Sequence, residues 1–364
     1  MPKLYLSGGA LAKNYRLLKA KTEGMLIPVL KADAYGHGAV FALDALLAEG
    51  AELFAVATAG EAHQLLDFLS KSKHSFTNAR VLIMGPIEEE ELPSLLSPRI
   101  ILSVHSPLYA RRLSRAIERL KASFLLPAHF SLAVHLKLET GMHRLGLRTE
   151  EALRAVLSLP HLRVEGGYSH LAHAAVKERT EEQRRRFLSL AAHLPSDAFT
   201  HLSASEGLLR YGDFSLSAVR VGLALYGVTP TDIALPLDPV MRFCARVLSV
   251  FTAKKGDFIG YGSVRAEKKR RLAIIDAGYA DGIPPSAERE KRVTLEGHEC
   301  AFFGEVCMDR ACLDIGDAPF REGDEITLFG KSRGDTAHFA AAHGVSPYVL
   351  LSHRSARTAR ILLP

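Results

Sequence analysis

Short apolar runs alternate with amphipathic segments over the first 227 residues of the chain. Apolar residues spaced three and four positions apart, such as Leu11, Tyr15 and Leu18, predict helices that bury one face. The apolar runs themselves are too short for helices and predict strands. Eight such runs occur here, at residues 26–30, 53–56, 81–84, 100–104, 131–138, 164–168, 199–202 and 219–225.

Eight strands that alternate with helices favour a parallel sheet, most simply a closed (β/α)8 barrel of the TIM type. An open, doubly wound sheet is the structural alternative. That fold would normally carry a glycine-rich G-x-G-x-x-G fingerprint after its first strand, and the sequence contains none. We therefore expect an α/β protein built on a barrel.

The helical periodicity largely stops after residues 229–239, a stretch that holds three prolines. Turn signals such as Lys255-Gly256-Asp257 then separate short β-like runs. We therefore expect two domains, a barrel over residues 1–232 and a mainly β C-terminal domain over residues 233–364. The β-like runs are residues 247–251, 272–275, 292–295, 301–303 and 325–328.

One helix of the barrel region has a recognisable start signal. Thr180 and Gln183 match the capping box, in which residues three positions apart exchange side-chain and backbone hydrogen bonds. We therefore expect a helix that begins near Thr180 and carries Phe187 and Leu190.

Composition and charge narrow the range of partners. With 364 residues, 48% of them hydrophobic, the chain is long enough for two well-cored domains. Its 46 basic and 40 acidic residues give a net charge of +6, which suits an anionic substrate or cofactor. The basic runs at residues 184–186 and 268–271 lack interleaved aromatic residues. They favour solvated faces, and we expect no nucleic-acid partner.

The cysteine content and the apolar runs indicate the cellular compartment of the protein. The chain has four cysteines, and none of them forms a C-x-x-C pair, so we expect neither a zinc site nor another metal. They are Cys244, Cys300, Cys307 and Cys312. Without a disulfide framework they favour a reducing compartment. Residues 1–10 hold no long apolar signal segment, and no run is apolar enough to span a membrane. We therefore expect a cytoplasmic protein without membrane association.

The most informative candidate for chemistry is Lys31, which follows an apolar run directly. Burial at the end of a strand disfavours the charged form of a lysine and lowers its pKa. The resulting neutral amine can form a Schiff base or act as a base. The alternative is a strand-end lysine that extends into solvent, as most lysines do.

Further candidates fall at the ends of other predicted strands, where barrel enzymes place their active sites. Lys137 and Arg144 follow the fifth strand, His170 follows the sixth and Ser205 follows the seventh. Each has a structural alternative, since His170 could be a core histidine and Ser205 could cap a helix. Their shared position at one rim favours a joint functional role.

The run of residues 28–38 resembles the lysine motif that binds pyridoxal phosphate in the alanine racemase family. Asp33 stands where that family usually has asparagine. The resemblance covers nearly the full chain and implies a barrel followed by a β domain, pyridoxal 5'-phosphate as cofactor and interconversion of L-alanine and D-alanine. D-alanine would then supply peptidoglycan synthesis. Similar motifs lie at residues 136–146, 219–227, 258–263, 277–282 and 304–309.

The resemblance also implies how the reaction is divided between residues. Inversion of a carbon needs one acid or base on each face, and the matching residues are Lys31 and Tyr261. A tyrosine ordinarily has a pKa near 10 and keeps its proton at neutral pH. A hydrogen bond from His170 would assist Tyr261 in acting as a base. In the family this tyrosine comes from the partner subunit, which implies a homodimer with shared active sites. The alternative for Tyr261 is a strand aromatic with its hydroxyl at the surface.

Arg220 matches an arginine that faces the ring nitrogen of the cofactor, and Arg144 would bind the substrate carboxylate. Met308 matches a substrate contact, and Tyr279 matches an entrance residue. Lys137 matches a lysine that is often carbamylated, where the added negative charge would brace Arg144. The residues that the resemblance assigns to the cofactor are Lys31, Tyr35, His170, Ser205, Arg220, Gly222, Leu223 and Tyr348.

Two departures from the family pattern bear on rate and selectivity. Glu305 stands where arginine is common, and Ala204 stands where asparagine is usual. One alternative function is a racemase or decarboxylase of the same fold that acts on another amino acid. Another is a non-catalytic protein that binds pyridoxal phosphate, although residues 240–364 with Tyr261 argue against it.

Overall fold

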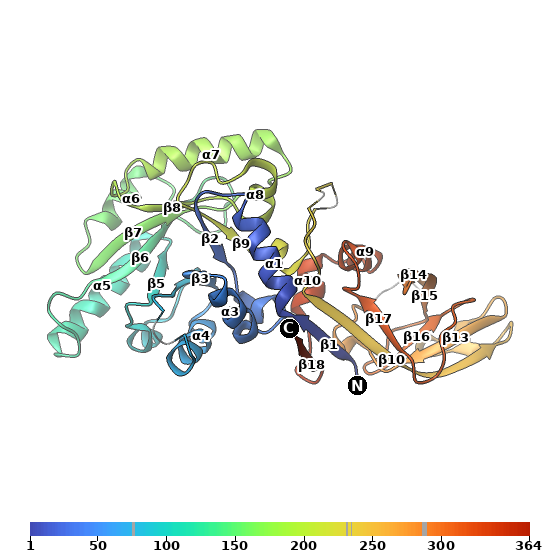
Figure 1. Cartoon of the computed structure of the whole chain (residues 1–364). Helices are drawn as coiled ribbons and strands as arrows, with labels where there is room; N and C mark the ends of the chain where they lie inside the picture. The colour runs from blue at the N-terminus through green and yellow to red at the C-terminus, as the bar shows by residue number, and fades with distance from the viewer. Residues whose placement is uncertain (75–76, 231, 234, 286–289) are drawn as a thin grey trace. The chain divides into compact units, whose positions relative to one another are not determined.

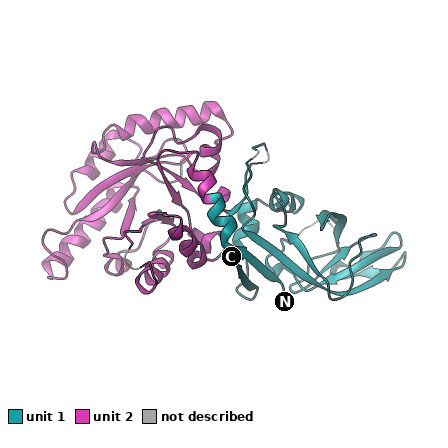
Figure 2. Cartoon of the chain, viewed as in Figure 1, with its two compact units in different colours: residues 1–14, 35–37, 226–364 teal, residues 15–34, 38–225 magenta. Residues whose placement is uncertain are grey.

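The structure is a computed structural model that describes residues 1–74, 77–230, 232–233, 235–285 and 290–364. Two positions of the proline-containing stretch 229–239, residues 231 and 234, lie outside the described residues. The chain divides into two compact units (Figure 2). Unit 1 comprises residues 1–14, 35–37 and 226–364, and unit 2 comprises residues 15–34 and 38–225.

Unit 2 is built around eight parallel strands in the order β2-β9-β8-β7-β6-β5-β4-β3 (Figure 1). The two ends of this sheet meet at the parallel bridge between Val29 and Ala55, where the Leu30 N–H donates to the Ala55 carbonyl at 2.8 Å. The predicted (β/α)8 barrel is therefore confirmed. The strands are β2 (Met25–Pro28), β3 (Leu53–Val56), β4 (Arg80–Ile83), β5 (Ile100–Val104), β6 (Leu132–Lys137), β7 (Leu162–Tyr168), β8 (Phe199–His201) and β9 (Ala218–Val221).

Helices follow the strands along unit 2 and bury their apolar faces, as the periodicity predicts. In α1, which contains residues of both units, Leu11, Tyr15 and Leu18 are all buried. The bounds are α1 (Gly8–Lys19), α3 (Ala39–Ala48), α4 (Ala59–Lys71), η1 (Glu89–Leu95), α5 (Pro107–Ala122), α6 (Glu150–Leu157), α7 (Lys177–Ala191), α8 (Ser205–Tyr211) and η2 (Leu223–Tyr226).

The predicted capping box at Thr180 and Gln183 is wrong. The helix α7 begins one turn earlier, and the Thr180 N–H donates to the Val176 carbonyl at 3.0 Å as part of the first turn. Both Thr180 and Gln183 are buried inside the helix, and Gln183 forms its hydrogen bonds with other segments. Phe187 is fully buried, as expected.

Unit 1 is mainly β, as predicted, and its sheet has the order β14-β15-β16-β13-β10-β1-β18, with β17 also paired to β10. The 13-residue strand β10 pairs with β1, β13 and β17 and so organises the sheet. The elements are β1 (Lys3–Ser7), β10 (Met241–Ala253), β11 (Phe258–Ile259), η3 (Tyr261–Ser263), β12 (Val264–Arg265), β13 (Arg270–Ile275), η4 (Tyr279–Asp281), β14 (Glu290–Leu295), β15 (His298–Phe303), β16 (Ala311–Asp314), β17 (Glu325–Phe329), α9 (Asp335–Ala342), α10 (Pro347–Ser352) and β18 (Ala359–Leu363).

The segment α2 (Lys31–Tyr35) is a left-handed turn rather than an ordinary helix. Ala32, Asp33, Ala34 and Tyr35 all have φ between 52° and 55°. Such a conformation costs roughly 1–2 kcal/mol for each residue with a side chain. Tertiary hydrogen bonds fix it, because the Ala32 N–H donates to Glu61 at 2.6 Å and the Asp33 carboxylate accepts from a helix N–H at 2.7 Å. The backbone directly after Lys31 is therefore held by its surroundings.

Gly166 of β7 is predicted to be intolerant of a side chain. A Cβ there would lie 2.3 Å from the Phe199 carbonyl oxygen and 2.8 Å from His135 Nε2. We expect Gly166→Ala to lower the free energy of unfolding by about 2 kcal/mol, measured by urea denaturation. Gly60 in α4 has nothing within 4 Å, so Gly60→Ala should raise it by about 0.5 kcal/mol. A neutral Gly166→Ala would contradict this close approach.

Candidate functional site

Polar side chains gather at the carboxyl ends of the barrel strands in unit 2. Lys137 is the last residue of β6, Arg220 lies in β9, and His170 comes two residues after β7. Lys31 follows β2, and Ser205 begins α8 just after β8. The structure therefore places these five predicted residues at one rim of the barrel.

The buried guanidinium of Arg220 is the centre of this group. Its Nη1 donates to His201 Nδ1 at 2.6 Å, and its Nη2 donates to the Ser169 carbonyl at 2.6 Å and to His170 Nδ1 at 3.2 Å. A guanidinium can only donate, so both imidazoles accept through Nδ1 and carry their proton on Nε2. His201 Nε2 then donates to His135 Nδ1 at 3.0 Å. One arginine thus fixes the tautomers of three histidines.

The same environment keeps these histidines uncharged. Burial and the positive charge of Arg220 hold the pKa values of His170 and His201 well below the ordinary value. Burial, assisted by Arg80 and Arg220, lowers the pKa of His135 to about 3. Burial also lowers the pKa of Arg220 to about 10, which leaves the guanidinium charged at neutral pH. A cation surrounded by neutral imidazoles results.

The two lysines at the rim have lowered pKa values. Burial lowers the pKa of Lys31, Arg144 and Arg220 lower it further, and Glu61 partly opposes them. Burial and the charges of Arg220 and Arg144 bring the pKa of Lys137 well below its ordinary value. The Lys137 amine lies 4.6 Å from the centroid of the Tyr168 ring. Both amines are therefore biased toward the neutral, nucleophilic form.

Positive charge is in excess at this rim. Within the described parts of the chain, no carboxylate forms an ion pair with Lys31, Lys137, Arg144 or Arg220, since the ion pairs of unit 2 lie elsewhere. The nearby carboxylate of Glu139 instead accepts backbone N–H groups, from Gly141 at 2.6 Å and from Arg144 at 3.3 Å. The rim is suited to a ligand with several negative charges.

Ser205 joins two strand ends. Its hydroxyl accepts from the Gly222 N–H at 3.1 Å and from the Ala224 N–H at 3.3 Å. The N-cap of α8 is Ala204, which has no side chain to cap the helix. The interpretation of Ser205 as a helix cap is therefore wrong, and the structure brings its hydroxyl to the turn that contains Gly222 and Leu223.

Two predicted tyrosines lie together in unit 1. The Tyr35 ring is 6.0 Å from the Tyr348 ring and 5.2 Å from the Tyr226 ring, centroid to centroid. Burial raises the pKa of Tyr35, so its hydroxyl remains a hydrogen-bond donor at neutral pH. Tyr348 in α10 is half-exposed.

The segments that carry Tyr279 and Met308 also lie side by side in unit 1. The Tyr279 N–H donates to the Cys307 carbonyl at 2.9 Å, and the Ala280 N–H donates to the Met308 carbonyl at 3.1 Å. Both predicted side chains are exposed, Tyr279 at 44% and Met308 at 53%. The structure thus brings together the entrance residue and the substrate-contact residue that the sequence predicts.

Tyr261 lies on the short turn η3 and is 69% exposed. Glycines with positive φ, Gly260 at 62° and Gly262 at 71°, flank it. A Cβ on Gly262 would lie 2.8 Å from a carboxylate oxygen of Glu305, so glycine lets that side chain approach. Tyr261 belongs to unit 1 and His170 to unit 2, and each is described within its own unit.

Sequence reasoning missed the two histidines that extend the Arg220 network. His135 lies two residues before Lys137 in β6, so both side chains point to the same side of the strand. This spacing was a usable sequence signal. His201 had no such marker in the short strand β8. Glu61 was also missed, although Thr58 and Glu61 form the capping box of α4 and match its sequence pattern.

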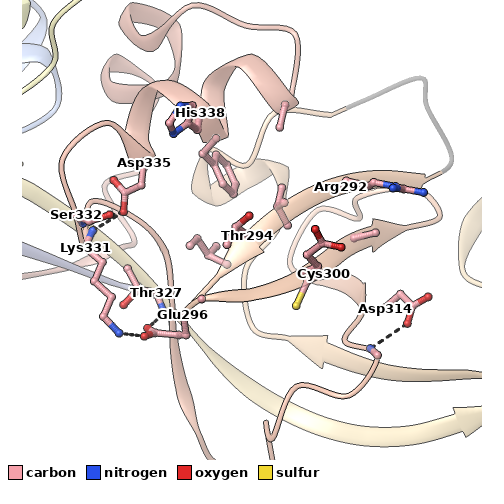
Figure 3. Close-up of a pocket in the computed structure, with 18 of the residues that line it drawn as sticks. Arg292, Thr294, Glu296, Cys300, Asp314, Thr327, Lys331, Ser332, Asp335 and His338 are labelled. Carbon is pink, nitrogen blue, oxygen red and sulfur yellow. Dashed lines mark hydrogen bonds and ion pairs between the residues drawn. The ribbon is translucent and has the colours of Figure 1, made fainter. Parts of the chain in front are cut away.

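A cavity of about 1050 Å³ lies within unit 1, among β14, β15, β17 and α9 (Figure 3). None of the predicted site residues lines it. Several of its charged groups have structural partners, since Lys331 pairs with Glu296 and Asp335 accepts the N–H groups of Lys331 at 2.8 Å and Ser332 at 3.0 Å. We therefore do not assign the predicted chemistry to this cavity.

The described residues contain neither a cluster of metal ligands nor a membrane-spanning helix. No three histidine, cysteine, aspartate or glutamate side chains among them gather closely enough to hold a metal ion. None of the helices in the described part of the chain combines the length and the apolar character that a membrane crossing requires.

The chain is similar to known proteins over most of its length. The family described as alanine racemase, N-terminal domain, matches residues 6–230, and the alanine racemase C-terminal domain matches residues 240–362. An alanine racemase of Nostoc sp. is 33% identical over 88% of this chain and 84% of its own length. One from Corynebacterium glutamicum is 32% identical over 96% of both chains.

Solved structures of alanine racemases are also similar to this chain over its full length. The biosynthetic alanine racemase of Pseudomonas aeruginosa superposes with a TM-score of 0.87 at 30% identity, over 100% of this chain and 99% of the other. The alanine racemase of Bartonella henselae, solved with covalently bound pyridoxal phosphate, gives a TM-score of 0.88 at 25% identity, with the same coverage.

The neutral histidines predict a loss of stability in acid. Their pKa values are lowered in the folded state, so below about pH 6.5 the unfolded chain binds more protons than the folded one. Stability is therefore complete above pH 6.5 and falls as the pH decreases toward the folded pKa values. At pH 5.5 we expect a loss of about 1.4 kcal/mol for each of the three, measured by urea denaturation.

Two variants test the assignment of that loss. His135→Asn should remove about one proton from the pH dependence, because one of the buried imidazoles is gone. His129→Asn, at an exposed position, should leave the dependence unchanged. The slope of the wild-type free energy of unfolding between pH 6.5 and 5.5 gives the number of protons taken up on unfolding. A value below one proton would contradict the buried network of neutral histidines.

Proposed function

We propose, from the premise that this chain belongs to the alanine racemase family, that it interconverts L-alanine and D-alanine with pyridoxal phosphate as cofactor. The chain is thus a pyridoxal-phosphate-dependent isomerase. The observation that carries this proposal is the cationic rim of the barrel, where Lys31 with its lowered pKa lies beside the buried Arg220. The roles of individual residues below are our proposals.

The residues present fit the cofactor. A phosphate group and a substrate carboxylate supply the negative charges that the cationic rim lacks. The lowered pKa of Lys31 favours the neutral amine, which is the form that bonds an aldehyde. When bound, pyridoxal phosphate supplies an electron sink that makes the α-proton of an amino acid acidic enough to remove.

The proposed cofactor contacts are the residues that the family resemblance assigns. The Ser205 hydroxyl and the Gly222 amide are already joined, which supports a shared role at the phosphate. Arg220 would face the ring nitrogen, and because a guanidinium only donates, it would keep that nitrogen unprotonated. The full proposed set is Lys31, Tyr35, His170, Ser205, Arg220, Gly222, Leu223 and Tyr348.

Lys31 and Tyr261 are the proposed acid and base pair. Inverting the α-carbon requires proton transfer at both of its faces. A tyrosine hydroxyl is ordinarily protonated at neutral pH and needs a partner that stabilises its phenolate, and the tautomer of His170 suits that role. Because His170 Nδ1 accepts from Arg220, its Nε2 carries a proton that can be donated to a phenolate. This arrangement favours Tyr261 as a base over an idle surface tyrosine.

Arg144 is proposed to bind the substrate carboxylate, with the Met308 amide as a second contact and Tyr279 at the entrance. The two departures lie near this machinery. Glu305 packs against the glycine that follows Tyr261, and Ala204 is the N-cap of the helix that begins with Ser205. We propose that both adjust rate and selectivity rather than reaction type.

We propose a homodimer in which the C-terminal domain, residues 233–364, contributes Tyr261 to the active site of the partner. The high exposure of Tyr261 and Met308 in the single chain supports this arrangement, because both would be covered on assembly. We further propose a cytoplasmic location and a supply of D-alanine for peptidoglycan.

Tyr261→Phe tests the proposed base. The variant removes the acidic hydroxyl and keeps the ring, so bound cofactor should be retained while D-alanine formation falls by about 10²- to 10⁴-fold. Cofactor absorbance and chiral chromatography measure the two properties. Tyr5→Phe, in which only a hydroxyl bond to Glu325 is lost, should racemise like wild type. Racemisation by Tyr261→Phe at the wild-type rate would contradict the mechanism.

Lys137 is predicted to carry a carbamate. Its buried amine is biased toward the neutral form beside two arginines. Attack of this amine on carbon dioxide would form an N–C bond, break one C–O π bond and release a proton to water, which leaves an anion that the arginines attract. Intact mass spectrometry under mild conditions in bicarbonate should show the mass of one added carbon dioxide. Lys137→Ala should lose this mass, and Lys291→Ala, at another buried lysine, should keep it. An unmodified wild-type protein would refute the proposal.

A further inference from the structure

Gln183 is a buried polar residue in the interior of α7 that the proposed reaction does not yet use. Its side chain is only 4% exposed. The amide oxygen accepts the Ala172 N–H at 2.8 Å, and the amide nitrogen donates to the His170 carbonyl at 3.1 Å and to Thr140 Oγ1 at 3.3 Å. A backbone N–H must donate and a carbonyl must accept, so the orientation of this amide is settled by its partners.

A directed chain of hydrogen bonds continues from Gln183. Ser169 donates its one hydroxyl proton to the Leu138 carbonyl at 2.7 Å. It therefore accepts from Thr140, whose Oγ1 lies 2.7 Å away and itself accepts from Gln183. Thr140 is 1% exposed and Ser169 is 2% exposed, so each of these groups would be left unsatisfied in the interior if one link were lost.

This chain connects two segments that carry proposed active-site residues. One segment leaves β6 and runs through Thr140 and Gly141 to Arg144. The other leaves β7 and runs through Ser169 to His170. A Cβ on Gly141 would lie only 3.5 Å from the Gln183 side chain, so the glutamine also packs against the turn before Arg144.

We propose that Gln183 is a positioning residue for the racemase reaction, because it sets the Arg144 segment and the His170 segment relative to each other. The inference rests on the proposed function, in which Arg144 binds the substrate carboxylate and His170 assists Tyr261. Gln183 itself touches neither substrate nor cofactor in this arrangement.

The physical consequence is a change in both kinetic constants. Displacement of the Arg144 segment weakens ground-state binding of alanine and raises KM. Displacement of His170 weakens assistance to the base and lowers kcat. A misplacement of about 1 Å can cost on the order of 10²-fold in rate, even when the mutated residue is far from the reacting atoms.

Gln183→Met tests the proposal, because methionine has similar length but no hydrogen-bonding amide. We expect kcat/KM for alanine to fall at least about tenfold, with KM raised about threefold or more, while cofactor content by absorbance is unchanged. Two controls separate positioning from general destabilisation. Ser114→Ala loses one buried bond to a backbone carbonyl elsewhere in the barrel, and Gln64→Met changes an exposed glutamine. Both should stay within about twofold of wild type.

Thr140 provides a second route in case Gln183→Met does not fold. Thr140→Val breaks the same chain and should raise KM and lower kcat, whereas Thr140→Ser keeps the hydroxyl and should restore both. In a double-mutant cycle, Gln183→Met with Thr140→Val should be no worse than the more severe single variant. Folded, cofactor-loaded Thr140→Val or Gln183→Met with wild-type KM and kcat would overturn the proposal.

Amide hydrogen exchange separates this inference from the proposed function. Faster exchange of the Ala172 and Arg144 N–H groups in Gln183→Met supports the positioning role, and unchanged exchange contradicts it. Absence of D-alanine formation by the wild-type protein would instead refute the proposed function, while the exchange result would still decide whether Gln183 holds the two segments.

Discussion

A buried guanidinium that has no carboxylate partner among the described residues determines the chemistry of this barrel. Among the described residues, Arg220 is bonded to two imidazole nitrogens and to backbone carbonyls. These acceptors satisfy its N–H groups but do not cancel its charge. Burial, reinforced by this uncancelled charge, keeps His170 and His201 neutral and lowers the pKa values of Lys31 and Lys137. The same excess of charge makes the site suited to a phosphate-bearing cofactor and an amino-acid carboxylate.

The reactive lysine also depends on an unfavourable backbone. The four residues that follow Lys31 adopt a left-handed turn. In isolation this conformation costs on the order of 1–2 kcal/mol for each residue. Glu61 at the start of α4 accepts the N–H of Ala32, and Asp33 accepts the N–H at the start of α3. Asp33 replaces the asparagine of the family pattern, and its carboxylate remains suited to this position at a helix N-terminus. The placement of Lys31 is thus a property of the folded barrel.

The hydrophobic pattern predicts the barrel well because its strands are short, buried and separated by amphipathic helices. Two strands, Leu53–Val56 and Ile100–Val104, have the predicted bounds, and the others differ by a few residues. The terminal strands β1 and β18 were missed because they are formed by long-range pairing, with Leu4 opposite both Phe243 and Arg360. The false capping box at Thr180 and Gln183 shows the same limit, since only tertiary contacts reveal where the Gln183 amide bonds. The rim residues were predictable from strand ends and His135 from its spacing to Lys137, whereas the hydrogen bonds that join Arg220 to the histidines are set by tertiary contacts.

Formation of D-alanine from L-alanine by the purified protein, with and without added pyridoxal phosphate, tests the central claim most directly. The cationic rim and the lowered pKa of Lys31 predict cofactor-dependent D-alanine in the wild-type protein and none in Lys31→Ala. A wild-type protein that binds pyridoxal phosphate through Lys31 but forms no D-alanine would contradict alanine racemisation, while leaving the cofactor site intact.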